Sequence, residues 1–221
     1  MNWEESKSLT PLKHDIILGF FARNQDFFLT GGSALGVFYL DHRRSMDLDF
    51  FSCHEINWPA INNTVRDVCR EIGGSFTSEV ATPHFHRFKV LRKDETEILD
   101  FVRESTQQIQ STKTRFGPVI VDTLEEIGVN KLCTLLGRTE PKDIIDLYFL
   151  QRAGFDALAH LDAARTKEGG LEPGILSWLL GQVDWSKAPM DLMIKPVSLA
   201  ELKQFVHSLI YALGNASFPV R

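Results

Sequence analysis

Hydrophobic and polar positions near the start of the chain predict a helix, a strand and a second helix, in that order. Over residues 12–23 apolar side chains recur about once per turn, which is typical of a helix. The apolar run 27–30 predicts a short buried strand and leads directly into Gly31-Gly32-Ser33. Residues 34–40 then have the pattern of a helix start. A strand, a glycine turn and a helix therefore follow one another without a linker.

Polar and apolar residues alternate over 47–51, as they do in a half-buried strand. In such a strand Asp47 and Asp49 point to one face, while Leu48 and Phe50 point to the other. Two carboxylates therefore share one side of the predicted sheet.

A helix and a hairpin are predicted next. Residues 57–72 have helical periodicity, and two glycines stop that helix. Strands over 85–91 and 96–102 form a hairpin around a short polar turn. Asp100 lies on the second of these strands, so a third carboxylate enters the sheet.

The strand pattern mostly ends near residue 123. Helices are predicted beyond it over 124–137, 141–153, 157–164, 174–183 and 199–213. The chain therefore divides into an α/β domain, residues 1–122, and a helical C-terminal lobe, residues 123–221. We expect a mixed α/β (α+β) protein.

The composition is that of an ordinary folded protein. Of 221 residues, 43% are hydrophobic and 24% are charged, which excludes disordered, collagen-like and coiled-coil classes. The net charge of −5 means that the overall field does not hold a nucleic acid. Any polynucleotide must bind through a local basic strip, for which the candidates are Arg87, Lys89, Arg92 and Lys93.

Two features bear on cellular location. The first residues are acidic where a signal peptide is basic, and no apolar run approaches the ~20 residues that span a bilayer. We therefore expect a cytoplasmic protein that does not contact a membrane.

The three acids of the predicted sheet need a physical explanation. Like charges on neighbouring strands repel, and a buried carboxylate is costly unless it is paired or metal-bound. A divalent cation removes this objection, and hard oxygen ligands at short spacing suit Mg²⁺, with Mn²⁺ as a substitute. We therefore predict a metal site at Asp47, Asp49 and Asp100, the alternative for Asp100 being an exposed hairpin acid.

The glycine turn is suited to anions. Gly31 and Gly32 let the backbone approach a ligand closely, and the amides at the start of the following helix attract negative charge. The Ser33 hydroxyl can donate to a phosphate oxygen. The turn matches neither the dinucleotide-binding nor the Walker pattern, so it predicts a triphosphate site of another kind.

Lys131 lies on a predicted helix that is apolar on nearly every side, so this buried cation needs an anion. That anion is either Asp146, in a structural ion pair, or a phosphate of the substrate. Asp143 falls in the first turn of its helix, where an acid stabilises the helix dipole in any case.

These residues resemble a known family. The order G-G-S … D-x-D … D is similar to that of the DNA polymerase β-like nucleotidyltransferase superfamily. Residues 31–35 and 39–51 resemble its AbiEii/AbiGii toxin branch, which typically reads G-G-[ST]-A-L … H-R-x-S-x-D-[IL]-D-F. Residues 131–138 and 142–148 are similar to the K-x-x-A-L-x-x-R … R-D-x-x-D-L-Y element of that branch.

The resemblance implies a polymerase β-like mixed sheet flanked by helices, a helical lobe, and Mg²⁺-dependent transfer of a nucleotidyl group from an NTP. It places metal ligands at Asp47 and Asp49, with Asp100 as a ligand or a base. Two departures, Lys142 for arginine and Thr134 for alanine, lie in the later element. Further nucleotide-binding or catalytic positions are implied at Gly31, Gly32, Ser33, Arg43, Lys131, Asp143 and Asp146.

The toxin branch also implies an acceptor and a partner. The acceptor is an RNA end, such as the 3′ end of tRNA, or a protein hydroxyl, and the partner is an antitoxin encoded nearby. Two alternatives stay open from the residues alone. One is an aminoglycoside-type adenylyltransferase, which acts on a small polycation, and the other is a nucleotide- or partner-binding protein without turnover.

Overall fold

The computed structural model describes residues 2–217, which fall into two compact units. The first unit consists of the residues up to 106 together with 110–123. The second consists of residues 107–109 together with those from 124 onward.

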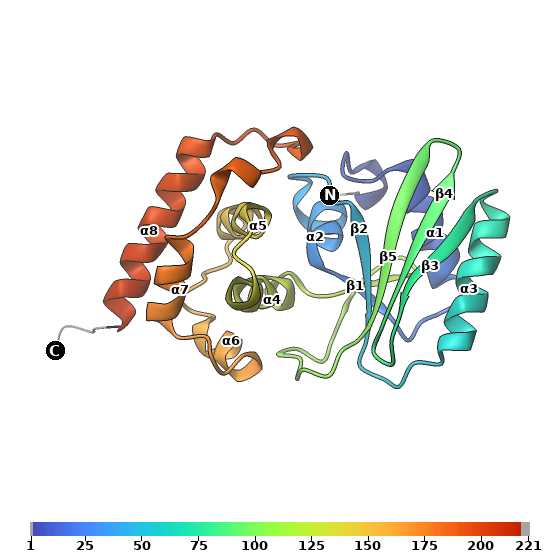
Figure 1. The fold of residues 1–221 in the computed structure, drawn as a ribbon, viewed down its shortest axis with the longest axis horizontal. Helices are drawn as coiled ribbons and strands as arrows, with labels where there is room; N and C mark the ends of the chain where they lie inside the picture. Colours follow the sequence, from blue (N-terminus) through green and yellow to red (C-terminus); the bar gives the residue numbers. More distant parts are fainter. Residues whose placement is uncertain (1, 218–221) are drawn as a thin grey trace. The chain divides into compact units, whose positions relative to one another are not determined.

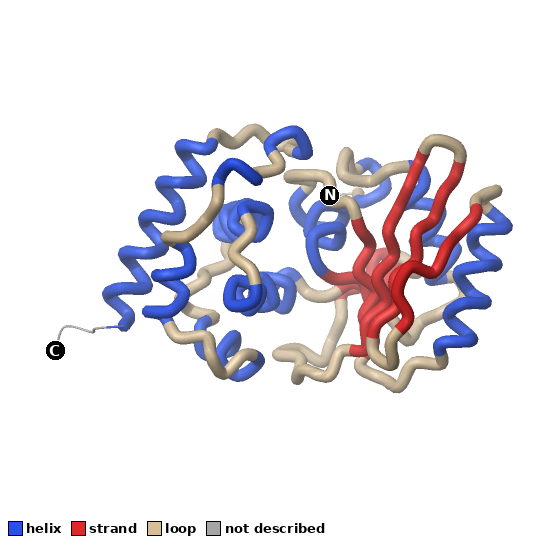
Figure 2. Tube along the Cα trace, in the orientation of Figure 1, coloured by secondary structure: helices blue, strands red, loops and turns tan. Residues whose placement is uncertain are grey.

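The first unit is built on a mixed sheet of seven strands in the order β3-β4-β5-β2-β1-β7-β6 (Figure 1). Its strands are β1 (Phe28–Thr30), β2 (Asp47–Ser52), β3 (Ser75–Ala81), β4 (Phe85–Arg92), β5 (Glu95–Arg103), β6 (Thr114–Phe116) and β7 (Val119–Val121). The pairs β1–β7 and β2–β5 are parallel, and all other neighbours are antiparallel. Figure 2 shows the strands as one continuous twisted layer.

The helical segments of this unit are η1 (Trp3–Glu5), α1 (Pro11–Phe21), α2 (Gly31–Ala34), η2 (Leu35–Leu40) and α3 (Trp58–Glu71). Pro at the first position and the Thr10 side chain, which accepts from a main-chain amide, begin α1. The predicted helix after the glycine turn is a short α-helix that continues as a π-helix in η2. It ends at Asp41, whose φ of 45° is left-handed.

One face of the sheet forms the core of this unit. Leu48 and Phe50 of β2 are fully buried there, as the alternating pattern predicts. The Phe50 ring stacks on Phe101 of β5 with centroids 4.8 Å apart, and Phe20 of α1 packs 4.6 Å from Phe50. Because this face is filled by aromatic rings, the acids of β2 are left on the opposite face.

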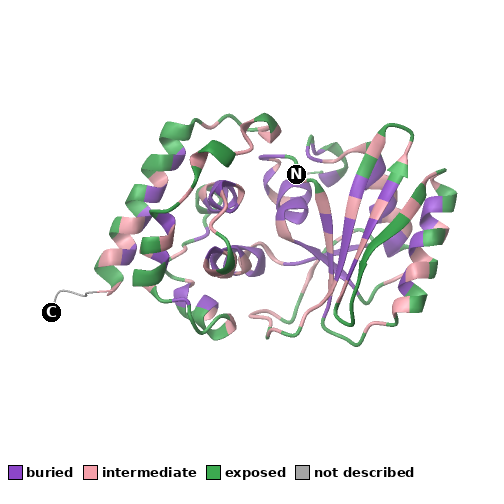
Figure 3. Cartoon of the chain, viewed as in Figure 1, coloured by how far each residue is buried: buried purple, intermediate pink, exposed green. Residues whose placement is uncertain are grey.

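Three strands were not expected from the sequence. The edge strand β3 is mostly exposed (Figure 3), and its sequence SFTSEVA does not alternate regularly between polar and apolar residues. Strands β6 and β7 have three residues each, which is too short for a periodic signal. They form a hairpin around Gly117-Pro118, and pairing with β1 places β7 in the sheet.

The second unit is helical, as predicted. Its helices are α4 (Leu124–Gly137), α5 (Pro141–Arg152), α6 (Leu161–Lys167), α7 (Pro173–Leu180) and α8 (Leu199–Ser217), with short 3-10 turns η3 (Trp185–Lys187) and η4 (Met190–Leu192). The prediction of a helix over 157–164 was wrong at its start, because Asp156 caps a turn at Leu158 and Ala159 instead. None of the described helices is long and apolar enough to cross a membrane.

Candidate active site

Three acidic side chains meet on the face of the sheet opposite the aromatic core. Asp49 of β2 is in register with Asp100 of β5, and Asp47 is two residues back on β2. Because side chains two apart share a face, all three point the same way. One carboxylate oxygen from each lies within 4.8 Å of the other two. This donor set of hard oxygens at short range fits a divalent cation.

Asp100 also has a partner on the neighbouring strand. Arg87 of β4 donates from Nε and Nη2 to the two carboxylate oxygens of Asp100, at 2.7 and 2.6 Å. These hydrogen bonds raise the pKa of Arg87. Asp100 is only 6% exposed, so it is not the exposed hairpin acid of the alternative interpretation. Arg87 therefore holds the orientation of the third carboxylate.

The glycine turn packs directly against the acids. Gly31 has a φ of +69°, and a Cβ at this position would overlap Oδ2 of Asp49. A Cβ at Gly32 would lie 2.8 Å from Nη2 of Arg43 and 3.0 Å from Oγ of Ser45. A side chain at either position would therefore displace a neighbouring side chain, and Gly31 is also favoured as glycine by its backbone conformation.

Ser33 and Arg43, two predicted nucleotide-binding residues, have internal partners. The buried Ser33 hydroxyl donates to the main-chain carbonyl of Asp47. Arg43 is also buried, and its Nη1 donates to the carbonyl of Arg44 at 3.0 Å. The Ser45 hydroxyl donates to Oδ1 of Asp47 at 2.8 Å. Together these contacts fix the turn and the start of β2 against each other, and the roles of Ser33 and Arg43 toward a phosphate stay predictions.

Lys13 of α1 belongs to the same site, although its place there was not predicted from the sequence. Its Nζ lies 3.2 Å from Oγ of Ser33, donates to the carbonyl of Ser45, and is 3.6 Å from Oε2 of Glu97. Burial lowers the pKa of Lys13, while Glu97, Asp47 and Asp49 act in the opposite sense. A single lysine within the apolar repeat of residues 12–23 was the available signal.

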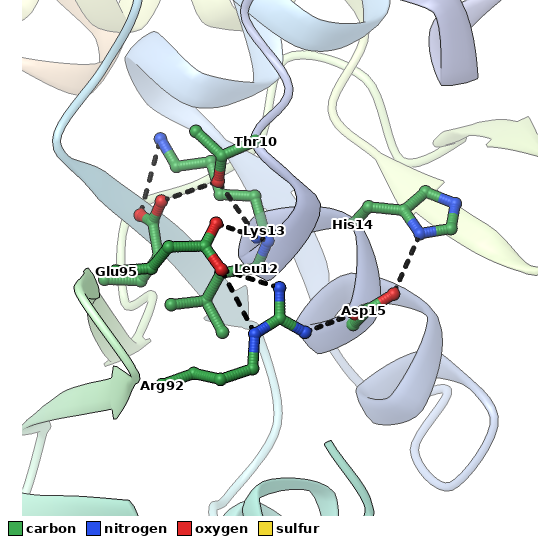
Figure 4. A network of polar contacts seen from close by, with 8 residues as sticks. Thr10, Leu12, Lys13, His14, Asp15, Arg92 and Glu95 are labelled. Carbon is green, nitrogen blue, oxygen red and sulfur yellow. Dashed lines mark hydrogen bonds and ion pairs between the residues drawn. The ribbon is translucent and has the colours of Figure 1, made fainter. Parts of the chain in front are cut away.

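The hairpin β4–β5 is tied to α1 by polar contacts beside Lys13 (Figure 4). Thr10 donates to Glu97 at 3.0 Å, and Arg92 bridges Asp15 of α1 and Glu95. Burial raises the pKa of Glu97 to about 6, against the opposing influence of Lys13. This network holds the strand that carries Asp100 to the helix that carries Lys13.

The stability of the protein should depend on the ionisation of Glu97. Its pKa is about 6 in the folded protein against an ordinary value of 4.5, so between these pH values the folded state keeps a proton that the unfolded chain has released. The free energy of unfolding should therefore fall by roughly 2 kcal/mol as pH rises through this window. Urea unfolding at a series of pH values measures it. Glu97→Gln should remove this component, and identical pH profiles for the two proteins would contradict the assignment.

Replacing Lys13 should be costly because it leaves Glu97 buried without its cation. We expect Lys13→Met to lower the free energy of unfolding by about 3 kcal/mol, and the double variant with Glu97→Gln to recover part of that loss. Urea unfolding is the measurement, with Lys7→Met as the control because Lys7 is exposed. If Lys13→Met were as stable as Lys7→Met, Lys13 would have no such structural role.

Lys131, Asp143 and Asp146 come together in the second unit. Nζ of Lys131 on α4 lies 2.8 Å from Oδ1 of Asp143 and 2.7 Å from Oδ2 of Asp146, both on α5. Both acids are fully buried, and Arg138 also contacts Asp143 at 3.3 Å. The ion pair between Lys131 and Asp146, one of the two alternatives, is therefore present. Lys131 forms a second ion pair with Asp143. A role for these residues toward a substrate stays a prediction.

The basic strip predicted on the hairpin is divided between two faces. Arg87 and Lys89 lie on the face of the three acids, because they alternate with the buried Phe88. Arg92 is engaged by Asp15 and Glu95, and Lys93 occupies the hairpin turn with a φ of 54°. Only the first two are therefore placed beside the candidate metal site.

Three carboxylates gathered on a mixed sheet, with a tight glycine turn packed against them, are the arrangement that the sequence predicts for a nucleotidyltransferase. The family model described as nucleotidyl transferase AbiEii toxin, type IV toxin–antitoxin system, matches residues 18–215. The chain belongs to this family of nucleotidyltransferase toxins. A search of curated proteins finds no match.

Solved structures confirm the predicted fold class. JHP933 from Helicobacter pylori is 22% identical with a TM-score of 0.63, the match covering 93% of this chain and 90% of that one. A putative nucleotidyltransferase from H. pylori is 20% identical with a TM-score of 0.61, covering 93% of each chain. MenT4, a nucleotidyltransferase toxin from Mycobacterium tuberculosis, is 16% identical with a TM-score of 0.56, and the match covers 92% of this chain and 82% of that one.

Proposed function

We propose that this nucleotidyltransferase moves a nucleoside monophosphate from an NTP to a hydroxyl of an acceptor, with Asp47, Asp49 and Asp100 holding Mg²⁺ or Mn²⁺. The observation that carries the proposal is the meeting of the three carboxylates directly beside Gly31. A divalent cation bound there would neutralise the clustered acids and stabilise charge on the phosphates.

The reaction exchanges one phosphate ester bond for another. The acceptor oxygen bonds to the α-phosphorus of the NTP, the bond from that phosphorus to the α–β bridging oxygen breaks, and pyrophosphate leaves. The hydroxyl proton passes to a basic oxygen at the site or to water. Because attacking and leaving oxygens are roughly in line, the chain must hold the two substrates on opposite sides of the α-phosphate.

The chain's own residues divide these tasks. We assign the main-chain amides of the glycine turn, Gly31 and Gly32, to the triphosphate, because they lie at a helix start. Lys13 supports this role by joining the turn to the segment that precedes β2. Arg87 orients Asp100, so we assign Asp100 as a ligand rather than a base. Further contacts to the nucleotide are proposed for Ser33, Arg43, Lys131, Asp143 and Asp146, as the resemblance implies.

The family membership supports a toxin whose activity is opposed by an antitoxin partner. For the acceptor we propose an RNA end, such as the 3′ end of tRNA, over a protein hydroxyl. Arg87 and Lys89 support this choice, because they put positive charge on the face of the three acids. The same charge disfavours the small polycation that an aminoglycoside-type enzyme would accept.

The test supplies each NTP in turn with the protein, Mg²⁺ and total tRNA. Label on the α-phosphate should appear in RNA, and label on the γ-phosphate should appear in pyrophosphate. Asp49→Ala should abolish both signals. Parallel reactions replace tRNA by a cell protein extract or by an aminoglycoside.

Each outcome of this test is decisive for one part of the proposal. Transfer of α-label to protein or drug instead of RNA would overturn the acceptor assignment while keeping the enzyme class. Release of no pyrophosphate from any NTP would overturn the proposed turnover.

A further inference from the structure

A row of apolar side chains crosses the sheet one step beyond the three acids. The cross-strand register aligns Phe28 of β1 with Phe51 of β2, Phe51 with Val102 of β5, and Val102 with Phe85 of β4. The rings of Phe28 and Phe51 lie 6.4 Å apart. We call Phe51 and Phe85, with the aliphatic Val102 between them, the aromatic row; all three side chains remain partly exposed.

The aromatic row lies on the same face as the acids. Phe51 is two residues from Asp49, and Val102 is two residues from Asp100, so each pair projects from one side of its strand. Two residues along a strand span about 7 Å. Partly exposed apolar side chains therefore lie next to the candidate metal site, and their distance from it along the strand is about the length of one nucleotide.

The aromatic row and the glycine turn lie on opposite sides of the acids. Strand β1 runs from Phe28, beside the row, through Thr30, which pairs with Asp49, to the turn at Gly31. Strand β2 runs in the opposite direction. It begins at Asp47, whose carbonyl accepts from the Ser33 hydroxyl of the turn, passes Asp49, and reaches Phe51 near its other end. The acids are thus between the two features.

Cations accompany these aromatic side chains. The Arg87 guanidinium lies 5.6 Å from the centre of the Phe85 ring, and Nζ of Lys113 lies 4.0 Å from that of Phe28. Both cations are ion-paired, with Asp100 and Asp122 respectively. Lys89, on the same face, forms no ion pair with any described residue. Aromatic rings interleaved with cations are the chemistry that binds single-stranded nucleic acid.

We propose that the aromatic row is the acceptor site, and that it takes the terminal base of a single-stranded polynucleotide by stacking on Phe51 and Phe85. This inference rests on the proposed function, since it assumes that the triphosphate occupies the glycine turn. In-line displacement then requires the acceptor hydroxyl to approach from the side opposite the turn, which is the side of the aromatic row. A nucleic-acid base has a π-face that can stack on Phe51, whereas a serine or threonine hydroxyl or an aminoglycoside has none.

The test measures binding of a short fluorescein-labelled single-stranded RNA by fluorescence anisotropy. Phe51→Leu keeps an apolar side chain and removes the ring, so we expect affinity to fall about tenfold. Phe51→Tyr, which restores a ring, should recover binding. Tyr211→Leu, which removes a ring that is 69% exposed on α8, is the matched control and should bind as the wild type does.

A second probe separates stacking from general charge attraction. The same RNA with an abasic 3′-terminal nucleotide should bind the wild type about as weakly as the intact RNA binds Phe51→Leu. Equal affinity of wild type and Phe51→Leu for the intact RNA, or equal affinity of the wild type for both RNAs, would overturn the inference.

Failure of this inference differs from failure of the proposed function. If the row is not the acceptor site but the enzyme is a nucleotidyltransferase, Phe51→Leu will transfer α-label to RNA at the wild-type rate at low RNA concentration. If the proposed function itself is wrong, the wild type will transfer no label at all. If the inference holds, transfer by Phe51→Leu will be reduced at low RNA concentration, while NTP affinity measured by calorimetry is unchanged.

Discussion

Gly31→Ala should reduce nucleotidyl transfer by at least about a hundredfold, because a methyl group at this position cannot coexist with the Asp49 carboxylate. The new Cβ would overlap Oδ2 of Asp49, so the carboxylate or the turn must move. The left-handed φ of +69° adds roughly 1–2 kcal/mol of backbone strain for a residue other than glycine. Transfer of α-label at saturating NTP measures the loss.

Gly73→Ala is the matched control for this substitution. Gly73 has a φ of +68°, almost the same as that of Gly31, but a methyl group added there would have nothing within 4 Å of it. We expect Gly73→Ala to lower the free energy of unfolding by a similar amount of backbone strain. Nucleotidyl transfer by the folded protein should be unchanged. Equal activity loss in both variants would show that strain alone, and not displacement of Asp49, accounts for the effect.

Asp49→Asn should lower transfer roughly a thousandfold, with a parallel loss of metal affinity. The reason is that this carboxylate belongs to the cluster whose oxygens lie within 4.8 Å of one another. Neutralising one of three gathered acids also removes repulsion, so the metal-free variant should unfold at the same temperature as the wild type or higher. Electron paramagnetic resonance of Mn²⁺ titrated into the protein measures affinity apart from turnover.

The control is Asp94→Asn, which makes the same chemical change at an exposed acid in the β4–β5 turn. It should bind Mn²⁺ and transfer nucleotide as the wild type does. Wild-type Mn²⁺ affinity in Asp49→Asn would contradict the assignment of Asp49 as a metal ligand.

The sequence was sufficient for the central part of the site because its signals are local. Alternation over β2 placed Asp47 and Asp49 on one face, and the turn at Gly31 followed a short apolar strand. Both features depend on residues close together in the chain. Asp100 could be assigned to a strand, but its alignment with Asp49 arises from the parallel pairing of β2 and β5, which leaves no local pattern.

Other parts of the site could not be predicted because they depend on long-range contacts. Lys13 is a single lysine within an apolar helical repeat, but its partners Ser33 and Glu97 are far away in the sequence and could not be predicted from that repeat. The sequence groups Arg87 with the other cations of the basic strip, and its position opposite Asp100 follows only from the hairpin register. The buried environment of Lys131 and its pairing with Asp146, one of two alternatives, could be predicted from the sequence, but not that Asp143 contacts the same ammonium group.

The central claim is that the three acids of the sheet hold a divalent cation beside a triphosphate bound at the glycine turn. Anomalous diffraction at the manganese edge tests it most directly, using crystals grown with Mn²⁺ and an NTP analogue that has a methylene group in place of the α–β bridging oxygen. We expect an anomalous peak beside the carboxylates of Asp47 and Asp49, with phosphate density at Gly31 and Gly32. Absence of manganese from the site of the three acids, with the triphosphate bound elsewhere, would contradict this claim.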